Sequence, residues 1–402
     1  MVRSNRVNYW TGQEGREFER EFAHWIGTRH AIALSNGTLA LDLALQGLGI
    51  GAANGGNLTD EVIVTPRTFI ASVSCVVNAG VLPVFADINA DRGLINVETI
   101  GAVMSDRIRA VTPAHLAGWP CDMDAIMEFA SVHDFAVIED CAQAHGARIG
   151  NRSVGSIGDI GAWSFCQDKI MTTGAEGGMV TCNAEAMWSK MWSFKYHGKS
   201  WDAVYNRNHP PGFRLVHESI GTNWRMLEMQ AAIGLIQLRR MQKWTEQRAT
   251  IAQRLHAVLV QYPAAIRAPL PGNDMTHAFY RLYAYVRPDG LRPGWNRDRI
   301  VAAFQTENAP LFHGSCSEVY LEKAFDGLPY RPERRLPIAR ELGETSLFSA
   351  LGSSFHSMCS LITRITRLCF VGMGFLPSAP PRIVPHPAKD QFLRWQYRLL
   401  GY

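Results

Sequence analysis

Residues 164–180 have the sequence Ser164-Phe165-Cys166-Gln167-Asp168-Lys169-Ile170-Met171-Thr172-Thr173-Gly174-Ala175-Glu176-Gly177-Gly178-Met179-Val180. Lys169 stands between an aromatic-rich, strand-like run (161–165) and a turn of small residues that leads into a second short strand (178–181). Lysine is rarely buried in such a hairpin, so a solvated turn residue is one interpretation. A desolvated lysine amine, however, loses its proton readily and forms Schiff bases. Whether Lys169 is catalytic depends on what the rest of the chain supplies.

Length and composition describe an ordinary globular protein. The chain has 402 residues, of which 47% are hydrophobic, and its formal net charge is +4. A chain of this length can bury one large core and a smaller one, which favours two domains. The apolar content excludes a disordered chain, and the nearly balanced charge predicts no nucleic-acid partner.

The cysteines indicate reduced thiols rather than a disulfide framework or a metal site. None of the eight forms a Cys-x-x-Cys pair: they are Cys75, Cys121, Cys141, Cys166, Cys182, Cys316, Cys359 and Cys369. Residues 1–6 include no apolar signal region, and the apolar run 368–376 is too short to cross a membrane. We therefore expect a cytoplasmic protein with no metal and no membrane contact.

Short apolar runs alternate with helical patterns through the first 140 residues. Strands are expected at 30–34, 61–64, 83–86, 109–112 and 135–138, and helices at 14–26, 39–48, 69–79, 97–104 and 123–133. This rhythm predicts a mostly parallel sheet with helices on both faces. In such sheets, ligands bind at the carboxyl ends of the strands.

Two polar features stand at these strand ends. Asp140 follows an apolar strand, where a buried carboxylate is costly unless it meets a cation. The turn Ser35-Asn36-Gly37-Thr38 opens a helix, and its free N–H groups and hydroxyl can bind an anion. Taken alone, each feature can also be an ordinary helix cap.

The second half of the chain predicts a smaller domain. After a helix from Ala184 and a loop at 196–213, one long helix is expected from about Leu227 through Trp244 and beyond. A strand (280–286), a helix (297–308) and a loop from Leu311 to near Glu344 follow. We therefore divide the chain into a large domain (1–240), a smaller α/β domain (241–347) and a tail (348–402).

Four motifs occur in a fixed order: Asp140-x-x-Gln143-Ala144-x-Gly146, Ser164-Phe165-x-x-x-Lys169, Glu176-Gly177-Gly178 and Gly221-x-Asn223-x-Arg225-Met226. With the Gly37-Thr38 turn before them, they make residues 14–347 resemble the DegT/DnrJ/EryC1/StrS family of pyridoxal-phosphate-dependent sugar aminotransferases. The resemblance implies the α/β fold of type I, aspartate aminotransferase-like transferases. That fold has a large, mostly parallel sheet domain and a smaller C-terminal α/β domain.

The resemblance assigns roles at the reactive end of the cofactor, pyridoxal 5′-phosphate. Lys169 would bond to it as a Schiff base and move a proton between Cα of the amino donor and C4′ of the cofactor. Asp140 would pair with the pyridinium nitrogen, which supplies the cation that a buried carboxylate needs. Gln143 would lie near the phenolic oxygen. These partners favour the catalytic interpretation of Lys169 over a solvated turn.

Further positions match cofactor and substrate contacts of the family. Phe69 would stack on the pyridine ring, although a core aromatic is the alternative. Asn223 would reach the cofactor of a neighbouring subunit, which implies a homodimer with shared active sites. His197 and His313 lie where the family approaches the sugar, and for both a structural role is equally open. The phosphate would be held by Gly37, Thr38 and Ser164.

The expected activity is transfer of an amino group, from glutamate, to a nucleotide-linked keto-sugar in surface polysaccharide or amino-sugar biosynthesis. A sugar 3-dehydratase on the same fold is an alternative, but those relatives replace the lysine with histidine. A third possibility is a chain that binds cofactor without catalysing, because its tail is foreign.

Two departures from the family stand out. Ala175 occupies a position where close relatives often have glycine. After Leu347, where the family continues with a strand, a His-Pro turn and a final helix, this chain becomes rich in Arg, Ser and Pro, and Asp390 is its only carboxylate. Our hypothesis is an out-of-frame translation from near Leu347, which would leave the small domain without its closing elements. An authentic divergent extension is the alternative, and sequencing the gene across this codon distinguishes them.

Overall fold

A seven-stranded sheet forms the centre of the molecule. The computed structural model describes residues 3, 5–306, 311–314 and 317–350. The strand order is β1 (His30–Leu34), β9 (Gly178–Cys182), β8 (Ile160–Ser164), β5 (Ala136–Asp140), β4 (Ile108–Thr112), β2 (Glu61–Val64), β3 (Leu82–Phe85). Only β9 is antiparallel to its neighbours in this sheet, which confirms the mostly parallel sheet.

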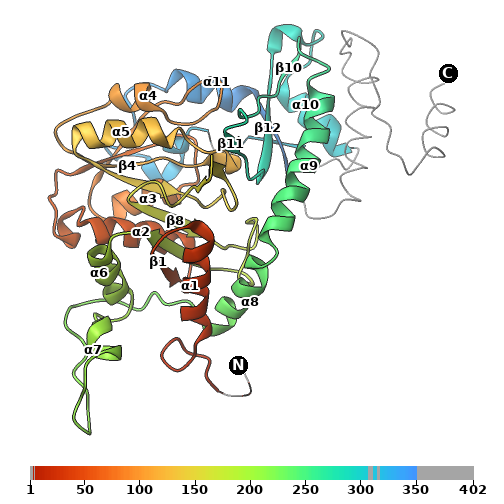
Figure 1. The fold of residues 1–402 in the computed structure, drawn as a ribbon. Helices are drawn as coiled ribbons and strands as arrows, with labels where there is room; N and C mark the ends of the chain where they lie inside the picture. Colours follow the sequence, from red (N-terminus) through yellow and green to blue (C-terminus); the bar gives the residue numbers. More distant parts are fainter. Residues whose placement is uncertain (1–2, 4, 307–310, 315–316, 351–402) are drawn as a thin grey trace, which may run out of the picture.

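Helices cover both faces of this sheet because its strands are apolar on both sides (Figure 1). In β2, Val62 and Val64 pack with α2 (Gly37–Leu48), α3 (Ala71–Asn78) and α6 (Glu185–Lys195), whereas Ile63 packs with α4 (Val97–Gly101) and α5 (Met123–His133). In α1 (Glu14–Ile26), Phe18 and Phe22 pack on Trp163 of β8 and on Phe165 just after that strand. The short helix α7 (Trp201–Tyr205) interrupts the expected 196–213 loop.

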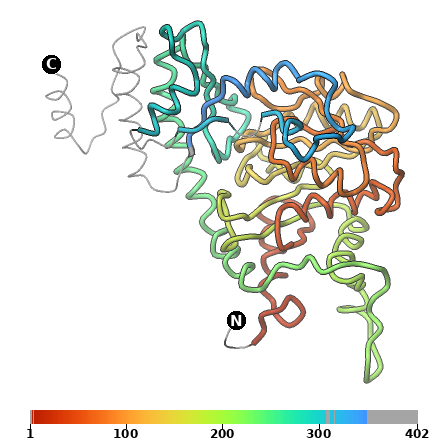
Figure 2. The backbone as a smooth tube through the Cα atoms, turned by 180° about the vertical axis from the view of Figure 1, so that it is seen from behind, coloured from red at the N-terminus to blue at the C-terminus, as the bar shows by residue number. Residues whose placement is uncertain are grey.

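A second, four-stranded sheet follows in the chain. Its order is β10 (Ile266–Arg267), β12 (Arg281–Val286), β14 (Ser346–Ala350), β13 (Leu311–His313), with α10 (Arg297–Thr306) and α11 (Pro337–Thr345) nearby. Figures 1 and 2 place this sheet at the end of the molecule opposite the N-terminus. Smaller elements are β11 (Met275–Thr276), β6 (Arg148–Ile149), β7 (Arg152–Ser153), η2 (Ala52–Asn54), η3 (Leu116–Gly118), η4 (Pro288–Gly290), η5 (Val319–Leu321) and η6 (Lys323–Phe325).

The prediction of one long bridging helix was wrong. The chain forms α8 (Glu228–Leu238) and α9 (Met241–Leu259), and Arg239 and Arg240 separate them. Gly234 of α8 lies against Phe18 of α1, whereas Ile251 and Leu255 of α9 lie in the core of the second sheet. The apolar pattern continues across the junction, so the pattern does not reveal that its two parts face different cores. The domain boundary at residue 240 stays a prediction.

The region before and after Leu347 also differs from the prediction. The expected loop to Glu344 contains β13, η5, η6 and α11. The strand thought to be missing after Leu347 is present as β14, where Leu347 pairs with Ala284 of β12 and His313 of β13. Residues 351–402 of the tail lie outside the described residues, so the out-of-frame hypothesis stays untested. Within the described ranges, no helix is long and apolar enough to cross a bilayer.

Candidate active site

Most of the predicted cofactor residues collect at one edge of the seven-stranded sheet. Because β1, β2, β5 and β8 run in the same direction, the segments that follow them leave the sheet at the same edge. Gly37 and Thr38 follow β1, Phe69 follows β2, Asp140 ends β5 and Gln143 follows it, and Ser164 ends β8 before Lys169. This edge is where open α/β sheets bind ligands.

Asp140 is buried and held in a fixed orientation. Its Oδ2 accepts a hydrogen bond from the Ser72 hydroxyl at 2.6 Å, and its Oδ1 accepts one from the Ala142 N–H at 3.1 Å. The Ser72 hydroxyl also shares a 2.7 Å hydrogen bond with the hydroxyl of Thr68. These contacts fix the carboxylate without neutralising it, so a cationic partner such as a pyridinium nitrogen fits its chemistry.

Glycines leave space at the edge where β1 and β8 end and β9 begins. A Cβ on Gly37 would lie 2.4 Å from Cβ of Ser164, and a Cβ on Gly178 would lie 2.1 Å from the carbonyl oxygen of Asn36. Asn36 caps α2 by accepting from the N–H of Leu39 at 3.0 Å. The helix N-terminus therefore presents N–H groups beside the Ser164 hydroxyl, a donor set that suits a phosphate.

Lys169 lies in the loop between β8 and β9, as the hairpin pattern predicts. Its side chain is 16% exposed, and its Nζ donates to Oδ2 of Asp168 at 3.1 Å. The same Oδ2 accepts a 2.6 Å hydrogen bond from the hydroxyl of Tyr280. Burial raises the pKa of Asp168, but the Tyr280 hydrogen bond and the Lys169 charge outweigh it and lower that pKa.

A strained turn positions Tyr280. Phe279, the preceding residue, has a φ of 50°, which costs a residue with a side chain roughly 1–2 kcal/mol. Its N–H donates to Nδ1 of His277 at 2.8 Å, and its carbonyl accepts from Arg248 at 3.2 Å. Its ring also stacks on the ring of His277 at 4.2 Å. These contacts stabilise the turn that brings Tyr280 to the Lys169 loop.

Two more groups complete the surroundings of Lys169 and Gln143. His145 is fully buried against Trp163 and Phe165, and burial, together with the charges of Lys169 and Arg248, lowers its pKa to about 3. This histidine is therefore neutral at physiological pH. Oε1 of Gln143 accepts from the N–H of Ala117 at 2.7 Å, which ties the predicted glutamine to the segment after β4.

The remaining predicted residues lie on surfaces. Phe69 is 68% exposed in the turn before α3, which begins at Ala71 rather than at Phe69 as expected. Asn223 is exposed, and its Oδ1 accepts from Nε of Arg225 at 2.8 Å. His197 is exposed with a φ of 60°. His313 pairs with Asp298 of α10 at 3.2 Å, so its described contacts lie in the second sheet and not at Lys169.

One cluster of metal-ligand residue types is a structural brace. His115, Glu139 and Cys141 lie close together and are buried. His115 Nε2 is 3.0 Å from Glu139, and its Nδ1 accepts from the N–H of Cys121 at 3.0 Å. Three N–H groups, of Gly155, Ile157 and Gly158, donate to the Glu139 oxygens. Protein groups thus occupy the positions that a metal would need.

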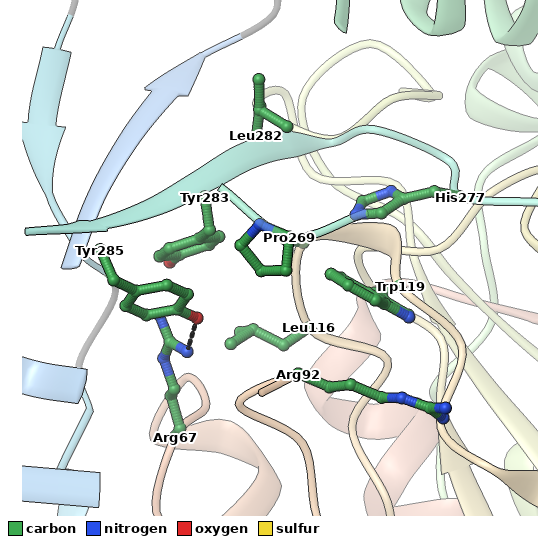
Figure 3. Close-up of a pocket in the computed structure, with 10 residues that line it drawn as sticks. Arg67, Arg92, Leu116, Trp119, Pro269, His277, Leu282, Tyr283 and Tyr285 are labelled. Atoms are coloured by element: carbon green, nitrogen blue, oxygen red, sulfur yellow. Dashed lines mark hydrogen bonds between the residues drawn. The ribbon is translucent and has the colours of Figure 1, made fainter. Parts of the chain in front are cut away.

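A small cavity separates the segment after β2 from β12 (Figure 3). Its volume is about 10 Å³, the space of a single water molecule. Arg67 crosses beside it, fully buried, and donates to the hydroxyl of Tyr285 at 2.6 Å while its guanidinium lies 4.4 Å from the ring of Tyr283. The cavity is too small for substrate, and Arg67 joins the two sheets there.

The sequence did not indicate every residue of the site. Ser72 lies in the first turn of α3 and Thr68 in the segment just before that helix, and their hydroxyls are four residues apart in sequence. Their closeness to Phe69 in sequence was the available signal. The contact of Tyr280 with Asp168 had no local signal because 112 residues separate the two.

Comparison with known proteins identifies the family. Residues 2–355 match the DegT/DnrJ/EryC1/StrS aminotransferase family. The chain belongs to this family. It is 37% identical to the spore coat polysaccharide biosynthesis protein SpsC of Bacillus subtilis over 297 residues, 74% of each chain. It is 36% identical to the GDP-perosamine synthase of Caulobacter vibrioides over 310 residues, 76% of this chain and 78% of that one.

Solved structures agree with this assignment. The fold matches that of the aminotransferase from Psychrobacter cryohalolentis with a TM-score of 0.88 and 54% sequence identity, over 91% of this chain and 94% of that one. DesV of S. venezuelae, solved in complex with a ketimine intermediate, has a TM-score of 0.78 and 29% identity over 91% of each chain. The predicted type I α/β fold is confirmed, and this family member is a pyridoxal-phosphate-dependent aminotransferase.

Proposed function

We propose that this protein transfers an amino group from glutamate to the keto group of a nucleotide-linked sugar, in surface polysaccharide or amino-sugar biosynthesis in the cytoplasm. The observation that carries the proposal is the arrangement of Lys169, Asp140 and the Gly37–Ser164 cradle at one edge of the parallel sheet. The substrate class is supported by relatives such as the GDP-perosamine synthase of Caulobacter vibrioides.

Bound pyridoxal phosphate supplies an electron sink for negative charge at the Cα of an amino donor. The chain's own residues hold and orient it. The α2 N-terminus with Gly37, Thr38 and Ser164 would bind the phosphate, and Asp140 would keep the ring nitrogen protonated because Ser72 fixes its carboxylate. Gln143 would face the phenolic oxygen, and Phe69 would cover the ring.

Lys169 would carry the covalent attachment and the proton transfer. Its side chain is largely shielded from solvent, at 16% exposure, and extends from a loop anchored by β8 and β9. A buried site of this kind excludes water from the reacting carbon and strengthens electrostatic interactions. When it is not bonded to the cofactor, the amine would take a proton from the donor Cα and deliver it to C4′.

We also propose a homodimer with shared active sites. Met229, Ile233 and Ile236 form a partly exposed apolar stripe at helical spacing on the outer side of α8. Phe213, Leu215 and Ile220, on the segment that projects beyond α7, are 80–93% exposed. Exposed apolar residues gathered in this way mark interaction surfaces, and Asn223 stands exposed between the two groups in sequence.

The first experiment locates the cofactor. The purified protein should show the visible absorbance of bound cofactor, and borohydride reduction followed by peptide mapping should place the label on Lys169. Lys169→Ala should lose both, while Lys190→Ala, which removes an exposed lysine on α6, should keep both. A colourless wild-type protein, or label on another lysine, would contradict the proposal.

The second experiment tests the reaction. ¹⁵N-labelled glutamate is incubated with a panel of nucleotide-linked keto-sugars, and the label should appear in the amino-sugar product. Release of ammonia with loss of the sugar hydroxyl would indicate the dehydratase instead. Cofactor on Lys169 without transfer to any sugar would favour the chain that binds but does not catalyse.

A further inference from the structure

Asp168 occupies an unusual place beside the cofactor lysine. A single oxygen, Oδ2, accepts hydrogen bonds from both Lys169 Nζ at 3.1 Å and the Tyr280 hydroxyl at 2.6 Å. The two donors come from distant parts of the chain, since Tyr280 directly precedes β12 of the second sheet. The Asp168 carboxylate therefore links the flexible amine of Lys169 to Tyr280, which lies outside the loop that carries Lys169.

Tyr280 is itself held in place by several contacts. Tyr280 is buried, its hydroxyl accepts from Arg281 at 3.3 Å, and the Arg281 guanidinium lies 4.3 Å from its ring. The left-handed conformation of Phe279 aims the tyrosine toward the loop. Strained backbone persists where surrounding contacts hold it and is concentrated at functional sites. The arrangement is thus built by several contacts and not by one adjustable side chain.

We propose that Asp168 is a positioning residue whose carboxylate binds the ammonium of Lys169 whenever that amine is not bonded to the cofactor, with Tyr280 holding the carboxylate in place. A free lysine side chain has many rotamers, and the ion pair restricts it to the mouth of the site. After it has taken a proton from the donor Cα, the ammonium remains within reach of the cofactor until it delivers that proton to C4′. This inference rests on the proposed role of Lys169.

The other charged and titratable groups described around Lys169 do not bind its ammonium. His145, behind the loop, has a pKa lowered by burial and by the Lys169 charge, so it stays neutral. Arg248 of α9 and Arg281 of β12 are cations, which disfavour a second positive charge nearby. Glu176 accepts from Sγ of Cys166 at 3.6 Å. Asp168 is thus the carboxylate that the described contacts place on Nζ.

The test measures how the full-length protein, freed of cofactor, recaptures added pyridoxal phosphate at different pH values. Capture needs the neutral amine, so its rate falls wherever the ammonium of Lys169 is stabilised. The carboxylate stabilises the ammonium, so Asp168→Asn should speed capture about tenfold at neutral pH and below. Tyr280→Phe should also speed capture, but by less, and Asp168→Glu should restore the wild-type pH profile of the rate.

Asp124→Asn is the matched control, because Asp124 is an exposed aspartate whose ion pair with Arg152 lies on the surface. It should leave the profile unchanged. An Asp168→Asn protein that melts at a lower temperature but keeps the wild-type pH profile would overturn the proposal, since Asp168 would then be structural only. So would Asp168→Glu behaving like Asp168→Asn. Borohydride mapping in the wild type separates these results from a failure of Lys169 as the cofactor lysine.

Discussion

At the scale of single residues, the proposed phosphate cradle depends on the absence of side chains. Gly37 has no positive φ, so the demand for glycine there is one of space: an added Cβ would lie 2.4 Å from Cβ and 2.9 Å from Cα of Ser164. Gly178, on the neighbouring strand, is equally crowded by the carbonyl of Asn36. Substitution should displace the donors that we propose face the phosphate rather than unfold the chain.

We predict that Gly37→Ala weakens the binding of pyridoxal phosphate about tenfold or more, because the α2 N-terminus must move away from Ser164. Equilibrium titration with pyridoxal phosphate, followed by its visible absorbance, measures the change. Gly101→Ala is the control: its Cβ would meet nothing closer than 3.7 Å, and alanine should favour α4 slightly. Equal affinities for Gly37→Ala and wild type would show that the phosphate lies elsewhere.

A second residue-scale prediction concerns a buried ion pair. Lys195 Nζ lies 2.5 Å from Oε1 of Glu19, and the same oxygen accepts from the N–H of Ala33 while Tyr9 donates to Oε2 at 2.8 Å. Burial lowers the pKa of Lys195 despite the attraction of Glu19. Lys195→Met would leave the carboxylate uncompensated and should cost about 3–5 kcal/mol of unfolding free energy.

Urea unfolding of Lys195→Met measures this loss, with the exposed Lys190→Met as control. Adding Glu19→Gln to Lys195→Met should recover part of the stability, because the unpaired charge is then gone. If the double variant is no more stable than Lys195→Met, lost packing and not the buried charge explains the effect.

At the scale of elements, the sequence predicted the parts that depend on local pattern. The alternation of strands and helices and the hairpin around Lys169 are confirmed. They could be predicted because the spacing of apolar residues along each element shows which of its faces is buried. The break between α8 and α9 and the strand β14 were missed. Their positions follow from which core each segment meets, and that depends on contacts distant in sequence, as does the Asp168–Tyr280 contact.

The junction of α1 and α8 gives a pH-dependent prediction. Glu228 is buried at the start of α8 and accepts from the N–H groups of Glu14 and Gly15, at 2.7 and 3.2 Å. Burial, followed by its hydrogen bond to the Glu14 carboxyl, raises the pKa of Glu228 to about 7. Because the folded pKa exceeds the ordinary value of 4.5, the folded state holds this proton more tightly than the unfolded chain.

This contribution to stability is fully present below pH 4.5 and is lost as the pH rises through 7. Glu228→Gln mimics the protonated form and should remove about 2 kcal/mol of the stability difference between pH 5 and pH 8. Urea unfolding at several pH values measures it, and Glu98→Gln on the exposed side of α4 is the control. A Glu228→Gln protein with the wild-type pH dependence would contradict the prediction.

At the scale of the whole molecule, we expect the exposed apolar stripe of α8 and the segment beyond α7 to form the interface of the dimer. Ile236→Asp places a charge in this stripe and should convert the dimer into monomers. Size-exclusion chromatography with light scattering measures the mass. Val132→Asp is the matched control, since Val132 is 75% exposed on α5, away from the stripe. If neither variant changes the mass, the stripe is not the interface.

Shared active sites make a sharper prediction than the dimer alone. If Asn223 completes the site of the partner, a dimer of one Lys169→Ala chain and one Asn223→Ala chain contains one intact site. Random assembly makes half of the dimers mixed, so co-expression should restore about a quarter of the wild-type activity. Lys169→Ala with Asp140→Asn should restore nothing, because Lys169 and Asp140 serve the same site of one chain. Equal failure of both pairs would place Asn223 in the site of its own subunit, and the apolar stripe would then join two independent enzymes.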